Sequence, residues 1–220
     1  MKFKAPFARI ALALAAVAGG ASVAVPANAG HIALDSTRTL GNQSWTGALG
    51  MDFNVLAPIW VTELGAFDSK EAVGFANPIS VGIFDRTTGS LVGSSAVLTT
   101  ANTTAGGTNN RFIDIADFML GVGSYSIVAD GFSASDRNGN VGIGGTGPTI
   151  DTGGGLIAFT GTSRYGASGT ALFFPNIVDG GPANRYDAGT FRFSAVPEPG
   201  SLALVGLALA GLGLAGRRRS

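Results

Sequence analysis

Three polar side chains at alternating positions form the first pattern in the sequence that could do chemistry. Asp136, Asn138 and Asn140 offer oxygen atoms at the spacing of the first half of a Ca²⁺-binding loop. An EF-hand also needs Gly at its sixth position and an acidic residue at its twelfth, where this chain has Val141 and Gly147. The sequence therefore excludes an EF-hand.

Two interpretations of these oxygen atoms stay open. Ca²⁺ tolerates irregular ligand shells, so a looser site could add Asp130 or Asp151. Asp and Asn also favour Asx turns, in which the side chain binds nearby backbone. We expect no other cofactor.

Residues for hydrolytic chemistry are scarce. His31 is the only histidine and the chain has no cysteine, which excludes Cys–His pairs and the usual zinc sites. A Ser-His-Asp triad would have to use His31, near the expected start of the mature chain. Glu63 and Glu71 are the only glutamates in the middle of the chain, and strand geometry places Asp114 and Asp117 on opposite faces. We therefore predict that the protein is not an enzyme. An extracellular carbohydrate-active enzyme with two carboxylates in one cleft is the alternative.

A glycine-rich run fits the letters of a dinucleotide-binding loop. Residues 142–147 match G-x-G-x-x-G, but a phosphate site of that kind lies between a strand and the start of a helix. Pro148 and three consecutive glycines, 153–155, follow instead. We reject a nucleotide site for this run.

Three aromatic side chains are candidates for stacking on sugar rings, namely Trp45, Trp60 and Tyr186. A tryptophan within a strand more often belongs to the core, so a structural role is the alternative for each.

The central part of the chain predicts an all-β fold. Apolar residues alternate with polar ones in short runs, which places one set of side chains on each face of a sheet. Gly89 ends a turn that predicts a hairpin between residues 79–85 and 90–98. The expected architecture is an antiparallel β-sandwich, either jelly-roll or Ig-like. The other expected strands cover residues 45–55, 59–67, 112–116, 125–130, 156–162, 171–174 and 190–194.

The length of this part, residues 30–195, suits one domain with a sizeable core. No disulfide framework supports it, since cysteine is absent. Three long loops, 101–110, 133–155 and 175–187, are either binding loops or disordered surface. Eight basic residues stand against thirteen acidic ones between Gly30 and Val196, a net charge near −5, which argues against nucleic acid or an anionic membrane surface as a partner.

The first 29 residues have the pattern of a signal peptide. A basic start is followed by a small, apolar stretch and then by Ala27 and Ala29 of an A-x-A cleavage site. Signal peptidase would cut here after transport through the Sec translocon, and the mature chain would begin at Gly30. Export is therefore expected.

The last 25 residues, 196–220, have three parts. Pro197-Glu198-Pro199 excludes a helix or central strand, because two prolines remove two N–H donors. Residues 201–216 are apolar and uncharged, and as a transmembrane helix they would span about 24 Å. Arg217-Arg218-Arg219 then acts as a stop that stays in the cytoplasm by the positive-inside rule.

This order of parts resembles the PEP-CTERM sorting signal of Gram-negative bacteria. The resemblance implies that Pro197, Glu198 and Pro199 are recognised by exosortase, a membrane-embedded transpeptidase that removes the helix. The strand patterns at 60–68, 81–85 and 123–129 also resemble a sandwich ectodomain that recurs in such proteins.

Together these signals predict an inner-membrane intermediate that is then delivered to the cell surface or extracellular matrix. The expected role is adhesion, glycan binding or structural support in the exopolysaccharide layer of a biofilm.

Overall fold

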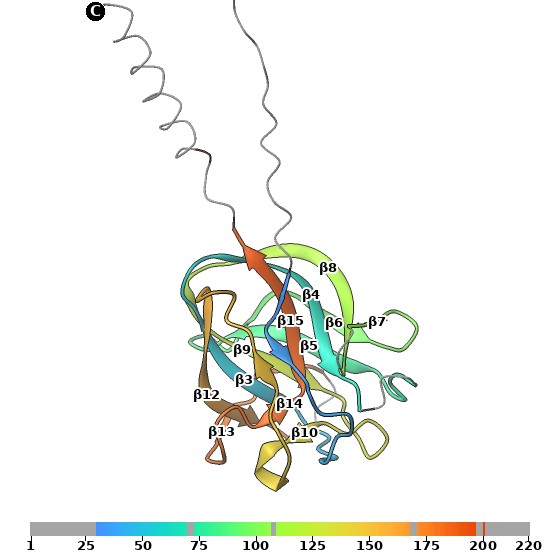
Figure 1. Cartoon of the computed structure of the whole chain (residues 1–220). Helices are drawn as coiled ribbons and strands as arrows, with labels where there is room; N and C mark the ends of the chain where they lie inside the picture. The colour runs from blue at the N-terminus through green and yellow to red at the C-terminus, as the bar shows by residue number, and fades with distance from the viewer. Residues whose placement is uncertain (1–29, 70–72, 107–108, 168–170, 197–199, 201–220) are drawn as a thin grey trace, which may run out of the picture.

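A computed structural model describes residues 30–69, 73–106, 109–167, 171–196 and Gly200 (Figure 1). The expected signal peptide, the Pro197-Glu198-Pro199 motif, the apolar segment 201–216 and Arg217-Arg218-Arg219 lie outside the described residues. Among the residues that are described, no helix is long and apolar enough to cross a membrane.

Two main antiparallel sheets build the domain. The first has the order β1 (His31–Ile32), β15 (Gly189–Ala195), β4 (Ile59–Phe67), β8 (Asn110–Leu120) and β7 (Thr104–Ala105). The second has the order β13 (Ile177–Asp179), β12 (Ile157–Tyr165), β3 (Leu49–Val55), β9 (Gly123–Asp130), β5 (Ile79–Asp85) and β6 (Leu91–Leu98). Two short pairs and a 3₁₀ turn complete the described elements: β2 (Leu34–Asp35) with β11 (Thr149–Ile150), β10 (Gly139–Asn140) with β14 (Tyr186–Asp187), and η1 (Val141–Ile143).

One hydrophobic core joins the two sheets. Phe53 on β3 and Phe191 on β15 are fully buried, and their ring centroids lie 5.1 Å apart across the interface. Phe193 continues this contact at 5.6 Å from Phe191. Because these side chains occupy alternate positions on their strands, each sheet presents one apolar face to the other. The prediction of an all-β domain of antiparallel sheets is confirmed.

Local sequence patterns located several strands closely. The expected strands 59–67 and 79–85 coincide with β4 and β5, and 90–98 differs from β6 by one residue. The hairpin turn is also confirmed, because Gly89 has a φ of 69° and its N–H donates to the carbonyl oxygen of Asp85 at 2.8 Å. The expected strand 45–55 begins too early, since β3 starts only at Leu49.

The expected strand 171–174 is wrong. Residues 172–176 form an irregular segment that crosses the outer face of the six-stranded sheet, where Leu172, Phe173 and Phe174 pack on a small apolar cluster. Glycines on the sheet make this close approach possible. A Cβ atom at Gly50 would lie 3.1 Å from Pro175, and one at Gly82 would lie 3.0 Å from Leu172. An apolar run in the sequence is compatible both with a strand and with a segment that packs on the face of a sheet, so the sequence alone did not distinguish the two.

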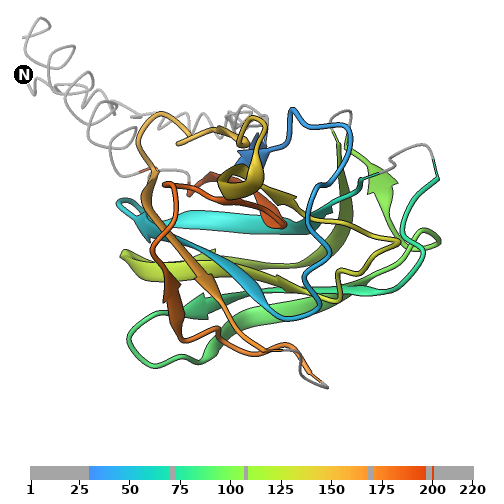
Figure 2. The ribbon, with the colours of Figure 1, turned by 90° about the horizontal axis from the view of Figure 1, so that it is seen from below.

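The two ends of the domain differ in what they carry. At one end, here called the terminal end, His31 pairs with Phe193, and the N–H of Val196 donates to the carbonyl oxygen of Pro58 at 3.4 Å. Both chain ends leave from there, and the turns 56–58 and 121–122 lie beside them (Figure 1). The opposite end, here called the loop end, holds β10, β13 and β14 (Figures 1 and 2).

Candidate functional site

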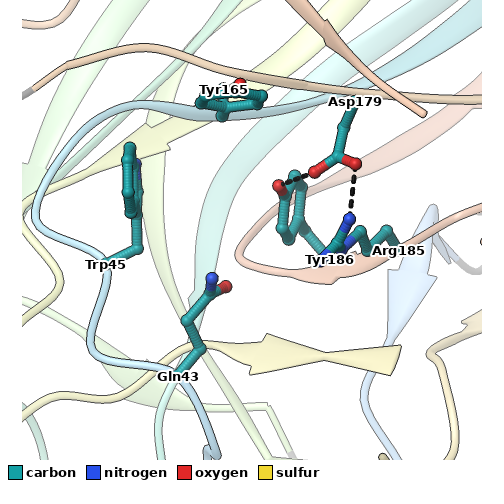
Figure 3. Close-up of a pocket in the computed structure, with 6 residues that line it drawn as sticks. All are labelled: Gln43, Trp45, Tyr165, Asp179, Arg185 and Tyr186. Carbon is teal, nitrogen blue, oxygen red and sulfur yellow. Dashed lines mark hydrogen bonds and ion pairs between the residues drawn. The ribbon is translucent and has the colours of Figure 1, made fainter. Parts of the chain in front are cut away.

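A pocket of about 440 Å³ opens at the loop end (Figure 3). The distant parts of the chain that form it are the segment before β3, the end of β12, the end of β13 and the start of β14. The residues that line it are Gln43, Trp45, Tyr165, Asp179, Arg185 and Tyr186.

Two aromatic side chains form one wall of the pocket. Trp45 and Tyr165 meet edge to face, with ring centroids 5.7 Å apart and an interplanar angle of 89°. The indole N–H of Trp45 donates to the carbonyl oxygen of Gly166 at 3.2 Å, which fixes the ring. Both side chains are only half-buried. A fixed, accessible aromatic wall of this kind suits stacking against an apolar ring face.

The opposite wall is polar and centres on Asp179. Its carboxylate accepts hydrogen bonds from Arg185 Nη1 and from the Tyr186 hydroxyl, and one from the Gly181 N–H at 2.9 Å. Burial alone would raise the pKa of Asp179, but these donors outweigh it and hold the pKa below its ordinary value. Asp179 is therefore a permanently charged acceptor at neutral pH.

The Tyr186 hydroxyl keeps its proton under the same conditions. Burial foremost, and then the hydrogen bond to Asp179, raises the pKa of Tyr186 well above its ordinary value. Arg185 is anchored on its other side, because its Nε donates to Asn140 Oδ1 at 2.9 Å. The polar wall is thus preorganised before any ligand arrives.

Gln43 adds a further hydrogen-bonding group at the floor of the pocket (Figure 3). Its side-chain oxygen accepts from Asn138 Nδ2 at 2.8 Å and from Asn140 Nδ2 at 2.9 Å. Its Nε2 has no acceptor within the described ranges, and Figure 3 shows the amide group directed into the cavity. Gln43 therefore offers a donor to a ligand.

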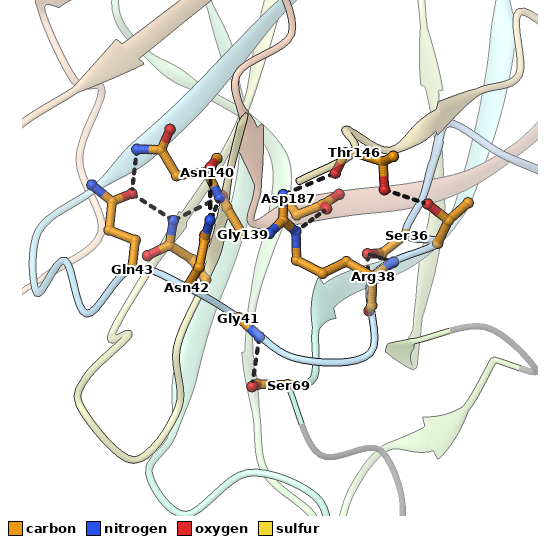
Figure 4. A network of polar contacts seen from close by, with 12 residues as sticks. Ser36, Arg38, Gly41, Asn42, Gln43, Ser69, Gly139, Asn140, Thr146 and Asp187 are labelled. Carbon is orange, nitrogen blue, oxygen red and sulfur yellow. Dashed lines mark hydrogen bonds and ion pairs between the residues drawn. The ribbon is translucent and has the colours of Figure 1, made fainter. Parts of the chain in front are cut away.

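A dense polar network holds the floor in place (Figure 4). It joins residues 36–43 to residues 138–146 through side-chain and backbone hydrogen bonds. Asn42 Nδ2 donates to the carbonyl oxygens of Asn140 and Gly144, at 3.0 and 2.8 Å, and Arg38 Nη2 donates to those of Gly144 and Thr146. The first half of the 133–155 loop is therefore ordered by contacts with the start of the domain.

The three candidate Ca²⁺ ligands take part in structural hydrogen bonds. The carboxylate of Asp136 accepts from the backbone N–H groups of Ala76 and Asn77 at 2.7 and 2.9 Å, while Asn138 and Asn140 support Gln43. No group of three or more His, Cys, Asp or Glu side chains arranged for a metal ion occurs among the described residues. The Asp136 oxygens thus bind the backbone of a distant segment, whereas Asn140 Oδ1 accepts from the N–H of Gly142 at 2.7 Å in the manner of an Asx turn. Calcium binding stays an untested expectation.

The glycine-rich run 142–147 also lies in this network. Its first two residues, 142 and 143, belong to η1, a turn of three residues. Arg38 crosses the run closely enough that a Cβ atom at Gly145 would meet the guanidinium at 2.6 Å. No helix begins in this run, so the geometry that a dinucleotide phosphate requires is not present there.

The comparison with known protein families concerns the end of the chain. Residues 195–219 match the PEP-CTERM protein-sorting motif. This chain carries a PEP-CTERM sorting motif. No curated protein and no solved structure matches the chain. The motif indicates an extracellular protein sorted by exosortase, and it agrees with the segment 196–220 that the sequence predicted.

Two of the three aromatic candidates line the pocket. Trp45 and Tyr186 lie there, whereas Trp60 is on β4, beside Met119 of β8 and near the terminal end. No motif in the sequence predicts the other four lining residues, Gln43, Tyr165, Asp179 and Arg185. Asp179 and Arg185 do lie in the loop 175–187, a candidate binding loop, but no local pattern marks the individual side chains, because only the approach of four chain segments makes them neighbours.

The carboxylates considered for hydrolysis lie elsewhere. Glu63 is opposite Asp114 across β4 and β8, and it forms an ion pair with Arg192 at 3.2 Å. Burial foremost, together with Asp114, raises the pKa of Glu63 despite Arg192. Asp114 and Asp117 are both exposed, and a register shift after Asp114 interrupts the regular alternation between them. Glu71 lies outside the described residues.

His31 does not lie in the pocket. Its Nδ1 is 2.8 Å from Asp151 Oδ2 at the terminal end, and its ring lies 5.3 Å from that of Phe193. This pair ties the start of the described chain to the loop after β11.

The buried carboxyl group of Asp187, beside the polar network, is expected to make the free energy of unfolding depend on pH. Burial dominates its environment and raises its pKa from 3.8 to about 6, although Ser36 and Arg38 act in the opposite direction. The folded state therefore binds this proton more tightly than the unfolded state, so its contribution to stability is lost as pH rises from about 4 to 6. We expect the difference in unfolding free energy between wild type and Asp187→Asn to change by about 2–3 kcal/mol across that window. Urea unfolding of both proteins at pH 4, 5, 6 and 7 measures this, and a pH-independent difference would contradict it.

Proposed function

We propose that this protein is exported by the Sec route, sorted by exosortase through an inner-membrane intermediate, and displayed at the cell surface or in the exopolysaccharide matrix, where it binds glycans without catalysis. We further propose that the two sheets form a β-sandwich that serves as a rigid support for the binding loops.

The pocket at the loop end carries this proposal. An aromatic wall of Trp45 and Tyr165 faces a charged acceptor, Asp179, with donors from Gln43 and Arg185 nearby. Sugar rings present an apolar face for stacking and hydroxyl groups for hydrogen bonds, so the two walls match the two sides of a pyranose. The lining residues Asp179 and Tyr186 lie on β13 and β14, at the opposite end of the domain from the chain ends (Figure 1), so the pocket stays accessible when the C-terminus is attached.

The single carboxylate in the pocket favours binding over hydrolysis. A glycosidase of the common type uses two carboxyl groups about 5–9.5 Å apart across the scissile bond. Among the residues lining the pocket, Asp179 is the only one with a carboxyl group, and it is already bound to Arg185 and Tyr186. The carbohydrate-active enzyme remains the second candidate, and release of reducing ends from matrix polysaccharide would support it.

Trp45→Ala is expected to reduce glycan affinity by about tenfold or more, since a stacked aromatic anchor commonly contributes over 1 kcal/mol to binding. The measurement is affinity electrophoresis of the mature protein in gels that contain exopolysaccharide from the producing cells, followed by calorimetry with purified oligosaccharides.

Trp60→Ala is the matched control, because it removes the other tryptophan without touching the pocket. Both variants must keep the thermal unfolding transition of the wild type. Equal retardation of Trp45→Ala and wild type would refute binding in this pocket.

A further inference from the structure

The terminal end of the domain exposes apolar side chains around the point where the chain leaves. Leu56 is 55% exposed, Met119 55% and Val122 68%, and Pro58 is also exposed. We call these four residues the terminal patch. Leu56, Pro58 and Val122 lie on the turns 56–58 and 121–122, which both cross from one sheet to the other. Met119 is at the end of β8, two residues before the second turn begins.

Strand pairing fixes how close these two turns are. Val55 pairs with Gly123 in the six-stranded sheet, and Ile59 pairs with Leu120 in the five-stranded sheet. Leu56 follows Val55, and Val122 precedes its partner Gly123, so the two turns run side by side. The last described strand ends next to them, since Ala195 pairs with Ile59.

The same region lacks charge. No Asp, Glu, Lys or Arg occurs in residues 53–62 or in residues 118–129. The loop end, by contrast, carries Arg38, Asp179, Arg185 and Asp187. Charged groups do occur elsewhere at the terminal end, but they are paired: Arg86 is held against Asp52 at 3.1 Å, and Asp151 lies 2.8 Å from His31. The charge-free surface is therefore confined to the turns around the chain exit.

The length of chain beyond the domain limits how far this surface can be from a bilayer. Five residues, 196–200, separate β15 from the apolar segment that begins at Ser201. A fully extended chain of five residues spans at most about 16–18 Å. With Ser201 at the start of a membrane span, the terminal patch would have to lie close to the lipid headgroups.

We propose that the terminal patch docks on the lipid bilayer, at the outer surface of the membrane that holds the unprocessed precursor. This inference rests on the proposed insertion of residues 201–216 and goes beyond it by assigning a lipid-contacting surface to the folded domain. Leu56 and Val122 enter the headgroup region, and Pro58 and Met119 flank them.

Docking has a consequence for processing. The Pro197-Glu198-Pro199 motif begins two residues after β15 ends, so docking holds the motif at the bilayer surface, where a membrane-embedded enzyme acts. Four apolar side chains give only weak, reversible binding without a tether. Removal of the apolar segment therefore also releases the domain from the membrane.

The absence of cysteine permits a site-specific test. Single substitutions Leu56→Cys, Val122→Cys and Ile143→Cys are made in the full-length precursor and labelled with an environment-sensitive fluorophore. Each precursor is reconstituted in nanodiscs of phosphatidylethanolamine and phosphatidylglycerol that carry a nitroxide-labelled lipid. Ile143 is the matched control, because it is 57% exposed but lies at the loop end.

We expect several-fold stronger quenching of labels at positions 56 and 122 than of the label at position 143. Adding Val122→Asp to the Leu56→Cys precursor is expected to lower the docked population by about tenfold, because the aliphatic side chain is replaced by a charge. Thermal unfolding checks that this variant is folded.

Two outcomes would overturn the inference. Equally weak quenching at all three positions would show that the domain stands away from the lipid. Energy transfer between labels on different precursors, without lipid quenching, would show that a second copy covers the patch. Failure of insertion is recognised separately, because the precursor would then not co-purify with the nanodiscs.

Discussion

Replacing Asp52 by Ala is expected to lower the free energy of unfolding by about 3 kcal/mol, because it leaves two guanidinium groups without their counter-charge. Asp52 is on β3 and is fully buried. Arg164 Nε donates to its two oxygens at 2.9 and 2.8 Å, and Arg86 Nε lies 3.1 Å from Oδ2.

The irregular segment 172–176 covers the outer face of the six-stranded sheet, which explains why this effect is large for a residue on that face. Phe174 lies over Arg164, with 5.1 Å between the guanidinium carbon and the ring centroid, and it limits access of water to the pair. The arginine side chains are 15% and 25% exposed, so part of their charge can be re-solvated. This places the expected loss near the lower limit for a broken buried ion pair.

Glu63→Ala supplies the matched comparison. Glu63 and Arg192 form an ion pair between neighbouring strands of the five-stranded sheet, and their side chains are 24% and 27% exposed. An ion pair so accessible contributes about 1 kcal/mol or less. Urea unfolding of the mature protein at pH 7 measures both variants. A loss below about 1 kcal/mol for Asp52→Ala would show that the buried cluster does not support the fold.

Truncation after Val196 is expected to abolish sorting while leaving the domain folded. The sorting motif spans residues 195–219, so this truncation removes nearly all of it. Val196 is retained because its N–H bonds the carbonyl oxygen of Pro58 and closes the end of β15. Without the apolar segment and the arginine cluster, nothing remains to hold the chain for exosortase.

The measurement is the intact mass of the protein recovered from the cell surface and from the medium. The wild-type chain is expected to begin at Gly30 and to end near Pro197-Glu198-Pro199, whereas the truncated chain is expected to lack surface delivery. Pro197→Ala with Glu198→Ala is the finer variant, since it keeps the apolar segment and alters only the recognised residues. A wild-type chain that still ends at Ser220 would contradict processing by exosortase.

The sequence alone determined the features that depend on local chemistry. The sorting motif consists of consecutive residues, so its three parts can be recognised in the sequence without knowledge of the tertiary structure. Strand alternation predicted β4 and β5, and the αL preference of Gly89 predicted the hairpin turn, because both depend on neighbours along the chain.

The tertiary structure alone decided the pocket and the cover of the outer sheet face. Gln43 and Asp179 come from distant parts of the chain, and only strand pairing and the polar network bring them together. The apolar sequence of residues 171–174 is typical of a strand. The segment instead packs across the outer face of the six-stranded sheet, because glycines at positions 50 and 82 leave room for it. Alternation of apolar and polar residues predicts which face of a strand is apolar. It does not predict which other segment packs on that face, because this depends on contacts between residues far apart in the sequence.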